Sequence, residues 1–134
     1  MKNYLLDTHA FLWSVFESHR IPPRVQQIIR DPAQTIWVSA VSLWEISLKY
    51  RLGKLALEGC NPSEMPDICN QMQYRLMPLT PQEASTYHEL GSNFHKDPFD
   101  RMLIHQAMQN KFVLLSKDPI VQQYAIEGLR VLWE

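Results

Sequence analysis

Four acidic residues stand beside apolar segments of this sequence, where an unpaired carboxylate is costly to bury. They are Asp7, Glu45, Asp100 and Asp118. Two carboxylates about 4 Å apart repel each other by about 4 kcal/mol at an effective dielectric constant of 20. If the fold brings all four together, they must bind a divalent cation, or some of them must take up protons.

The ligand atoms of such a cluster indicate its chemistry. All-oxygen ligation suits Mg²⁺ or Mn²⁺ rather than zinc, and neither His95 nor His105 has metal-ligand spacing. These cations keep several waters, activate one as a nucleophile, and offset the charge of a phosphate during in-line displacement. We therefore expect hydrolysis of a phosphodiester.

The order of apolar and helical segments predicts how the acids are positioned. Short apolar runs predict strands at residues 4–6, 35–38, 75–77, 112–115 and 129–132. Helical patterns fill the intervals at residues 9–17, 22–30, 39–52, 62–73, from 81 onward and 98–110. Strands alternating with helices predict an α/β fold, a mainly parallel sheet with helices on both faces. The crevice of such a sheet lies at the carboxyl ends of its strands, so the four acids should meet there.

The helix expected from Ser39 carries Glu45 within an apolar stripe, which comprises Val41, Trp44, Leu48 and Leu52. A second apolar row, comprising Leu43, Ile46 and Tyr50, could face the core instead. The alternative for Glu45 is an exposed pair with Lys49, which contributes only a few tenths of a kcal/mol. The exposed row and the apolar first helix could together bind a second copy of the chain or a helix of a partner. We expect this docking patch around Leu43, Ile46 and Tyr50.

Capping offers a second explanation for the other acids. Asp97 precedes Pro98 as an N-cap precedes a first-turn proline, and Asp100 then lies in the favourable first turn. Asp118 precedes a proline in the same way. Capping or a first-turn position explains each of these three acids when it is taken alone. The convergence of Asp7, Glu45, Asp100 and Asp118 on one edge of the sheet favours a metal site instead.

Length and composition limit the classes of protein. A chain of 134 residues is expected to form one domain over residues 1–134, and 46% hydrophobic with 20% charged residues is ordinary globular composition. Thirteen basic against fourteen acidic residues give a net charge of −1, which excludes a strongly basic nucleic-acid-binding coat. The two cysteines fit neither a disulfide framework nor a zinc pair, and no apolar run reaches membrane-spanning length. We expect a cytoplasmic protein without a membrane segment.

Four sequence blocks resemble PIN-domain ribonucleases, and most of all the VapC-type toxins of bacterial type II toxin–antitoxin systems. The blocks lie at residues 5–13, 39–46, 95–104 and 114–118, and the resemblance extends along essentially the whole chain. It implies a three-layer PIN fold with a five-stranded, mainly parallel sheet. It also implies endonucleolytic RNA cleavage dependent on Mg²⁺ or Mn²⁺, a homodimer, and a small inhibitory VapB-like antitoxin whose tail occupies the active site.

The resemblance assigns roles to individual residues. Asp7 would be a direct metal ligand, Glu45 would help to hold the metal and its water, and Asp100 and Asp118 would be the third and fourth acids. Asp97 is a further candidate ligand, although capping explains it well. Two hydroxyl residues would support the acids: Ser116 near Asp118, and Thr8, which could orient Asp7 or contact phosphate but could equally cap the first helix.

Basic residues flank the acids and are candidate RNA contacts at the rim of the site. They are Lys49, Arg51, Lys54, Lys96, Arg101 and Lys117, and a merely solvated surface is the alternative for each.

Competing functions are less consistent with the sequence. An aspartyl phosphatase would have a second acid two residues after Asp7, where His9 stands, and a dinucleotide-binding domain would have a glycine-rich turn there. A non-catalytic PIN-fold module that binds RNA or protein remains the principal alternative.

Overall fold

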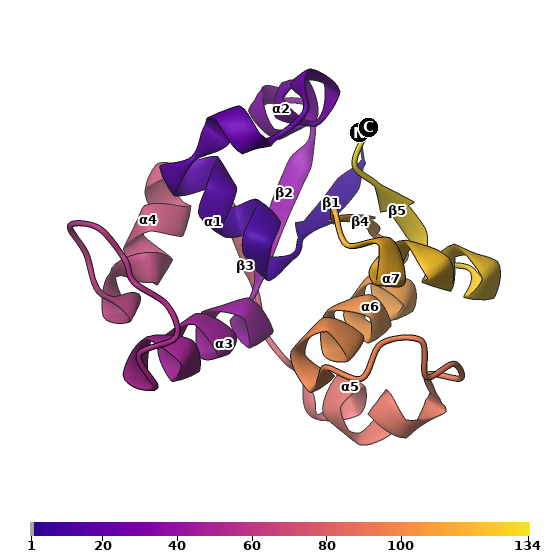
Figure 1. The fold of residues 1–134 in the computed structure, drawn as a ribbon. Coiled ribbons are helices and arrows are strands. Elements are labelled where there is room, and N and C mark those ends of the chain that lie inside the picture. The colour runs from indigo at the N-terminus through magenta and orange to yellow at the C-terminus, as the bar shows by residue number, and fades with distance from the viewer. Residues whose placement is uncertain (1) are drawn as a thin grey trace.

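A computed structural model describes residues 2–134 and contains the expected parallel sheet (Figure 1). Its five strands are β1 (Asn3–Leu6), β2 (Thr35–Ser39), β3 (Arg75–Met77), β4 (Val113–Leu115) and β5 (Arg130–Leu132). Their order is β3-β2-β1-β4-β5, and every neighbouring pair is parallel. Strand β1 is therefore central, and its carboxyl end meets those of β2 and β4.

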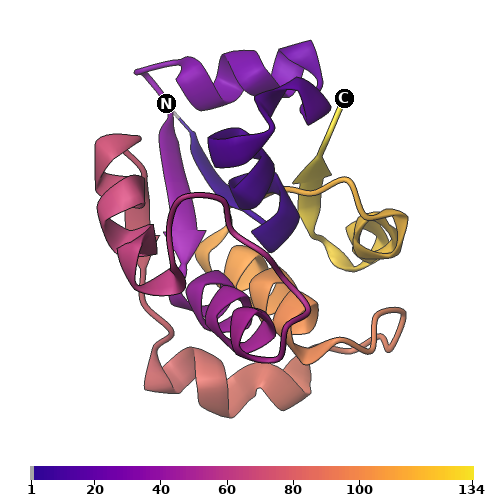
Figure 2. The same cartoon turned by 60° about the vertical axis from the view of Figure 1, so that its left-hand side comes forward.

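Helices cover both faces of the sheet, as predicted (Figures 1 and 2). They are α1 (Thr8–Phe16), α2 (Pro23–Arg30), α3 (Ala40–Arg51), α4 (Met65–Gln71), α5 (Pro81–Thr86), α6 (Pro98–Asn110) and α7 (Pro119–Gln122). Short 3₁₀ turns at Ser18–Arg20, Pro62–Glu64, Tyr87–Glu89 and Gln123–Glu127 connect them. Within residues 2–134, no helix is long and apolar enough to cross a membrane.

Two hydrophobic cores lie on opposite faces of the sheet because side chains alternate along each strand. Leu6 and Leu115 pack with α1, α2 and α4 in one core. Their neighbours Leu5 and Leu114 pack with α6 and α7 in the other. Burial of β1 and β4 from both sides explains why these strands are continuous apolar runs rather than alternating ones.

Helices α3 and α6, which carry two of the candidate acids, lie side by side in both overall views and contact each other (Figures 1 and 2). A largely buried polar network connects these two helices with α5. The Ser39 hydroxyl, at the N-cap of α3, donates to Gln106 Oε1 at 2.6 Å, and Gln106 Nε2 donates to Glu83 Oε1 at 3.0 Å. Asn110 Nδ2 donates to the second Glu83 oxygen at 2.9 Å. This network holds α3, α5 and α6 in one arrangement.

Replacement of Glu83 by alanine should destabilise the protein by about 1–3 kcal/mol, because it removes the acceptor of one buried Gln106 N–H and of partly buried N–H groups of Asn110 and Thr80. Burial alone would raise the pKa of Glu83, but hydrogen bonds from Gln106, Thr80 and Asn110 outweigh burial and lower it. The carboxylate therefore stabilises the fold above the unfolded pKa near 4.5, and this contribution is lost as the pH falls further. Urea unfolding at neutral pH, with exposed Glu89→Ala as the control, measures the effect; equal midpoints would contradict it.

The faces of α3 differ from the predicted stripe. Val41, Ser42, Glu45 and Ile46 are buried, whereas Trp44 is 59% and Leu52 56% exposed. Glu45 is thus buried as expected, but beside small and polar neighbours rather than within the stripe. The expected docking patch around Leu43, Ile46 and Tyr50 is wrong, because Ile46 is fully buried and Leu43 packs against the core.

Candidate active site

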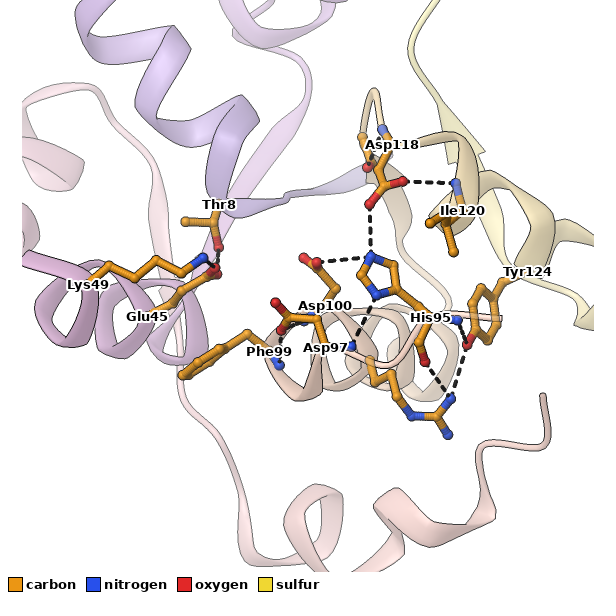
Figure 3. A network of polar contacts seen from close by, with 12 residues as sticks. Thr8, Glu45, Lys49, His95, Asp97, Phe99, Asp100, Asp118, Ile120 and Tyr124 are labelled. Carbon is orange, nitrogen blue, oxygen red and sulfur yellow. Dashed lines mark hydrogen bonds and ion pairs between the residues drawn. The ribbon is translucent and has the colours of Figure 1, made fainter. Parts of the chain in front are cut away.

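The carboxyl ends of β1 and β4 open into a cavity of about 320 Å³. Three of the four predicted acids line it, namely Asp7, Asp100 and Asp118, together with His9, Trp13, Lys117 and Pro119. Glu45 lies on the other side of Asp100 from His95 and Asp118 (Figure 3). The parallel sheet therefore gathers acids that are as much as 111 residues apart in the sequence.

Asp7 follows β1 directly and is buried. Its Oδ1 accepts a hydrogen bond of 2.7 Å from the Ala10 N–H, so Asp7 is the N-cap of α1. Burial raises the pKa of Asp7, and hydrogen bonds from Ser116 and Ala10 together with the charge of His9 only partly oppose this effect. A nearby cation would stabilise the charged form of such a buried carboxyl group.

Glu45 is held by two side chains (Figure 3). Thr8 donates to Glu45 Oε1 at 2.6 Å, and Lys49 forms an ion pair with Oε2. Burial alone would lower the pKa of Lys49, but the hydrogen bond and charge of Glu45 outweigh burial and raise it. Thr8 is therefore not the cap of α1, and its hydroxyl bonds Glu45 and Ser42 rather than the Asp7 carboxylate, so that it orients Glu45.

Asp100 lies in the first turn of α6 and is the most strongly perturbed acid. Burial, followed by repulsion from Asp97, raises its pKa to about 7, and the charge of His95 only partly opposes the rise. Glu45 and Asp7 also raise the pKa of Asp100, which means that the acids interact across the site.

Asp97 and Asp118 cap helices, as their proline neighbours predicted. Asp97 Oδ1 accepts from the N–H groups of Phe99 at 2.8 Å and Asp100 at 3.3 Å. Asp118 Oδ1 accepts from the Ile120 N–H at 2.8 Å, while its Oδ2 faces His95. Capping and site roles are therefore compatible, since a cap uses one oxygen of the carboxylate. Ser116 accepts from the Asp118 N–H at 3.2 Å and hydrogen-bonds Asp7.

His95 is a site residue that the sequence did not predict. Its Nε2 lies 3.1 Å from Asp100 Oδ2 and 2.8 Å from Asp118 Oδ2 (Figure 3). No metal-ligand spacing marks this histidine, because it lies in a loop and its partners come from two other elements. The available signals were its place two residues before the Asp97-Pro98 cap and at the start of the block 95–104.

The basic residues divide into two groups. Four of them are exposed: Lys117 on the wall of the acidic cavity, Lys96 beside a different cavity, and Arg51 and Lys54 at the end of α3 and just beyond it. The other two make contacts within the protein, and Lys49 is paired with Glu45. Arg101 contradicts the prediction that it contacts RNA, because it is only 7% exposed. Its guanidinium donates to backbone carbonyls and tyrosine hydroxyls inside the protein.

A divalent cation suits this set of side chains. Burial raises the pKa of Asp7 and Asp100, and the nearby acids add repulsion. The oxygen atoms of Asp100 and Asp118 that face His95 lie, with its Nε2, within 4.8 Å of one another. The donor atoms of the acids are oxygens, the ligands that Mg²⁺ and Mn²⁺ prefer.

Comparisons with known proteins agree with this architecture. The family described as PIN domain matches residues 4–127. Ribonuclease VapC22 of Mycobacterium tuberculosis is 28% identical over 118 residues, which cover 88% of this chain and 88% of that protein.

Two solved structures share the fold across nearly the whole chain. One is VapBC2 from Rickettsia felis bound to a promoter DNA fragment, with a TM-score of 0.69, 17% identity and coverage of 98% of this chain and 99% of that chain. The other is DNA-bound VapBC from Salmonella typhimurium, with a TM-score of 0.65, 14% identity and 98% coverage of both chains. The family match, the sheet topology and the acids at its carboxyl edge lead to one conclusion: this chain belongs to the PIN domain family.

Proposed function

We propose that this chain, as a single PIN domain, is a metal-dependent endoribonuclease and the toxin of a toxin–antitoxin pair. The observation that carries the proposal is the convergence of Asp7, Asp100 and Asp118 on one cavity, with buried Glu45 nearby. The similarity to a VapC ribonuclease supports RNA as the substrate.

Asp7, Glu45, Asp100 and Asp118 would hold Mg²⁺ or Mn²⁺, which when bound activates water and offsets the charge of the scissile phosphate. Asp97 is a further candidate ligand through the oxygen that its cap leaves free. Thr8 and Lys49 hold the carboxylate of Glu45 in one orientation, and Ser116 does the same for Asp7. The caps of α1 and α7 fix Asp7 and Asp118 relative to the backbone. Lys117, on the cavity wall, attracts the RNA phosphate.

The test of this function is cleavage of a mixed cellular RNA pool by protein freed of any bound inhibitor. Cuts should appear with Mg²⁺ or Mn²⁺ and disappear with EDTA. Intact RNA under every condition, with no thermal stabilisation by either metal, would refute the nuclease and favour the binding-module alternative.

Replacement of Lys117 by alanine should weaken RNA binding several-fold. It should also reduce the magnitude of the slope of log K against log salt concentration, where K is the RNA association constant, by about 0.7, because one phosphate contact is lost. Lys117 lies over the Trp13 ring, with Nζ 5.7 Å from its centroid, at the mouth of the acidic cavity. Fluorescence anisotropy with a short single-stranded RNA, in an Asp7→Asn background that does not cut it, measures both quantities. Lys2→Ala, at the opposite edge of the sheet, is the matched control. An unchanged salt slope would remove Lys117 from the RNA path.

An antitoxin is the proposed protein partner. A second cavity, of about 340 Å³, shares His9 and Trp13 with the acidic one and is lined mainly by Leu12, Phe16, Leu55 and Leu57. Solved structures with this fold include VapBC assemblies, which supports the assignment. A small protein should copurify from the native host and inhibit cleavage when it is added back. A lack of inhibition would contradict this partner.

A homodimer is also proposed, now through a different surface from the expected one. Trp44 and Leu48 of α3 and Leu52 at its C-cap form an exposed apolar row. Sedimentation velocity should give the mass of a dimer, and Trp44→Lys should shift it to a monomer. A wild-type monomer at high concentration would contradict the proposal.

A further inference from the structure

The loop that precedes α6 places one histidine between two of the acids (Figure 3). The side chain of His95 is only 12% exposed, and its Nε2 contacts Asp118 of the β4–α7 connection and Asp100 of α6. These two acids come from different elements, and the ring contacts both of them, Asp118 through a hydrogen bond and Asp100 at ion-pair distance.

The hydrogen bonds define the tautomer of the ring. The Asp97 N–H donates to His95 Nδ1 at 3.2 Å, so Nδ1 acts as an acceptor and carries no proton. The proton is therefore on Nε2, where it is donated to Asp118 Oδ2 at 2.8 Å, while Asp100 Oδ2 lies at ion-pair distance, 3.1 Å from the same nitrogen. A histidine that ligates a metal must offer a ring nitrogen lone pair, and here Nε2 offers a proton instead.

The backbone of His95 is held on both sides. Its N–H donates to the Tyr124 hydroxyl at 3.0 Å, and its carbonyl accepts from Arg101 Nη1 at 3.2 Å. Arg101 also binds the Tyr124 hydroxyl at 3.0 Å and the carbonyls of Ser92 and Leu90. This buried guanidinium therefore fixes the loop before α6, and with it the position of the imidazole.

We propose that His95, anchored by Arg101 and Tyr124, is a positioning residue whose Nε2–H donates to Asp118 and faces Asp100, and which thereby sets the spacing of the two carboxylates. It is not a metal ligand, although its Nε2 lies near ligand atoms. The inference rests on the proposed function, because the carboxylates it positions are those assigned to the cation. Partners that orient ligating groups typically contribute about 10- to 100-fold to metal affinity.

The first experiment determines the ring tautomer by nitrogen NMR of the whole protein, with the His95 signals identified by their loss in His95→Gln. The proton should lie on Nε2 in the metal-free protein and remain there when Mg²⁺ is added. A proton on Nδ1 in either state would overturn the proposal.

The second experiment measures Mn²⁺ affinity by calorimetry. His95→Ala should bind Mn²⁺ about 10- to 100-fold more weakly than wild type. His95→Gln, whose side-chain amide can still donate near the position of Nε2, should stay within about threefold of wild type. Exposed His19→Ala is the matched control. Wild-type affinity in His95→Ala, or equal losses in both His95 variants with folds intact by near-UV circular dichroism, would overturn the donor role.

A pulsed electron paramagnetic resonance spectrum of the Mn²⁺-loaded protein separates a donor from a ligand. It should contain no coupling to a directly bound nitrogen, and such a coupling would overturn the proposal. These measurements are independent of RNA cleavage. If RNA is not cleaved but the tautomer and the Mn²⁺ affinities are as expected, only the nuclease function is refuted. If Mn²⁺ does not bind, the metal site is refuted, and the tautomer measurement still tests the contact of His95 with the two acids.

Discussion

Asp7→Asn should reduce RNA cleavage by about three orders of magnitude or more, because it removes a charge from the proposed metal site while leaving the fold intact. Asparagine caps helices about as well as aspartate, so the bond from the Ala10 N–H to position 7 is retained. Burial raises the pKa of Asp7, which means that the charged form is unfavourable without a cation. The metal-free variant should therefore melt at or above the wild-type temperature.

The measurement is cleavage of labelled RNA with saturating Mg²⁺ or Mn²⁺, combined with thermal melts in EDTA. Asp67→Asn is the matched control, because Asp67 is exposed in the first turn of α4. Wild-type cleavage by Asp7→Asn would refute the assigned site. A variant that fails to fold would contradict the expected melting behaviour, because the cap is retained and only the charge of the carboxylate is removed.

Metal-free protein should lose about 1–3 kcal/mol of stability as the pH rises from about 4 to about 7, and Mg²⁺ should restore it. The pKa of Asp100 is raised from 3.8 to about 7 by burial and by Asp97. The folded state therefore retains a proton that the unfolded chain releases, so folding becomes less favourable throughout this window and changes little above it. The full shift would correspond to about 4 kcal/mol, and the smaller range allows for solvent screening of a side chain that is 23% exposed.

Urea unfolding in EDTA at several pH values measures how the free energy of unfolding depends on pH. The difference between wild type and Asp100→Asn isolates the contribution of Asp100 from those of other acids such as Glu83. The variant should have a flatter profile than wild type, and Mg²⁺ affinity of the wild type should rise with pH up to about 7. Parallel profiles for the two proteins would contradict the raised pKa of Asp100.

Local pattern predicted much of this protein. The apolar runs correspond to the five observed strands, and the helix starts match the caps at Asp7, Ser39 and Asp97 within a residue or two. The short helix α7 was not among the predicted elements, although the Asp118-Pro119 pair indicated its cap. These features depend on neighbours within about four residues, which the sequence displays directly. The parallel sheet then placed Asp7 and Asp118 at one edge, because their strands β1 and β4 are adjacent.

Other features depended on packing between distant segments. The two apolar rows of α3 are similar in sequence, and only contact with the sheet decided that Ile46 is buried and Trp44 exposed. Arg101 has the composition of a surface phosphate contact, yet the Tyr124 hydroxyl and several loop carbonyls surround it. His95 lacks a motif because its partners, Asp100 and Asp118, belong to different elements. Sequence by itself thus determined the elements, their caps and the acids, since these follow from periodicity and local hydrogen bonding. Tertiary structure decided which side chains meet, since the geometry of those contacts exists only once the helices pack against the sheet.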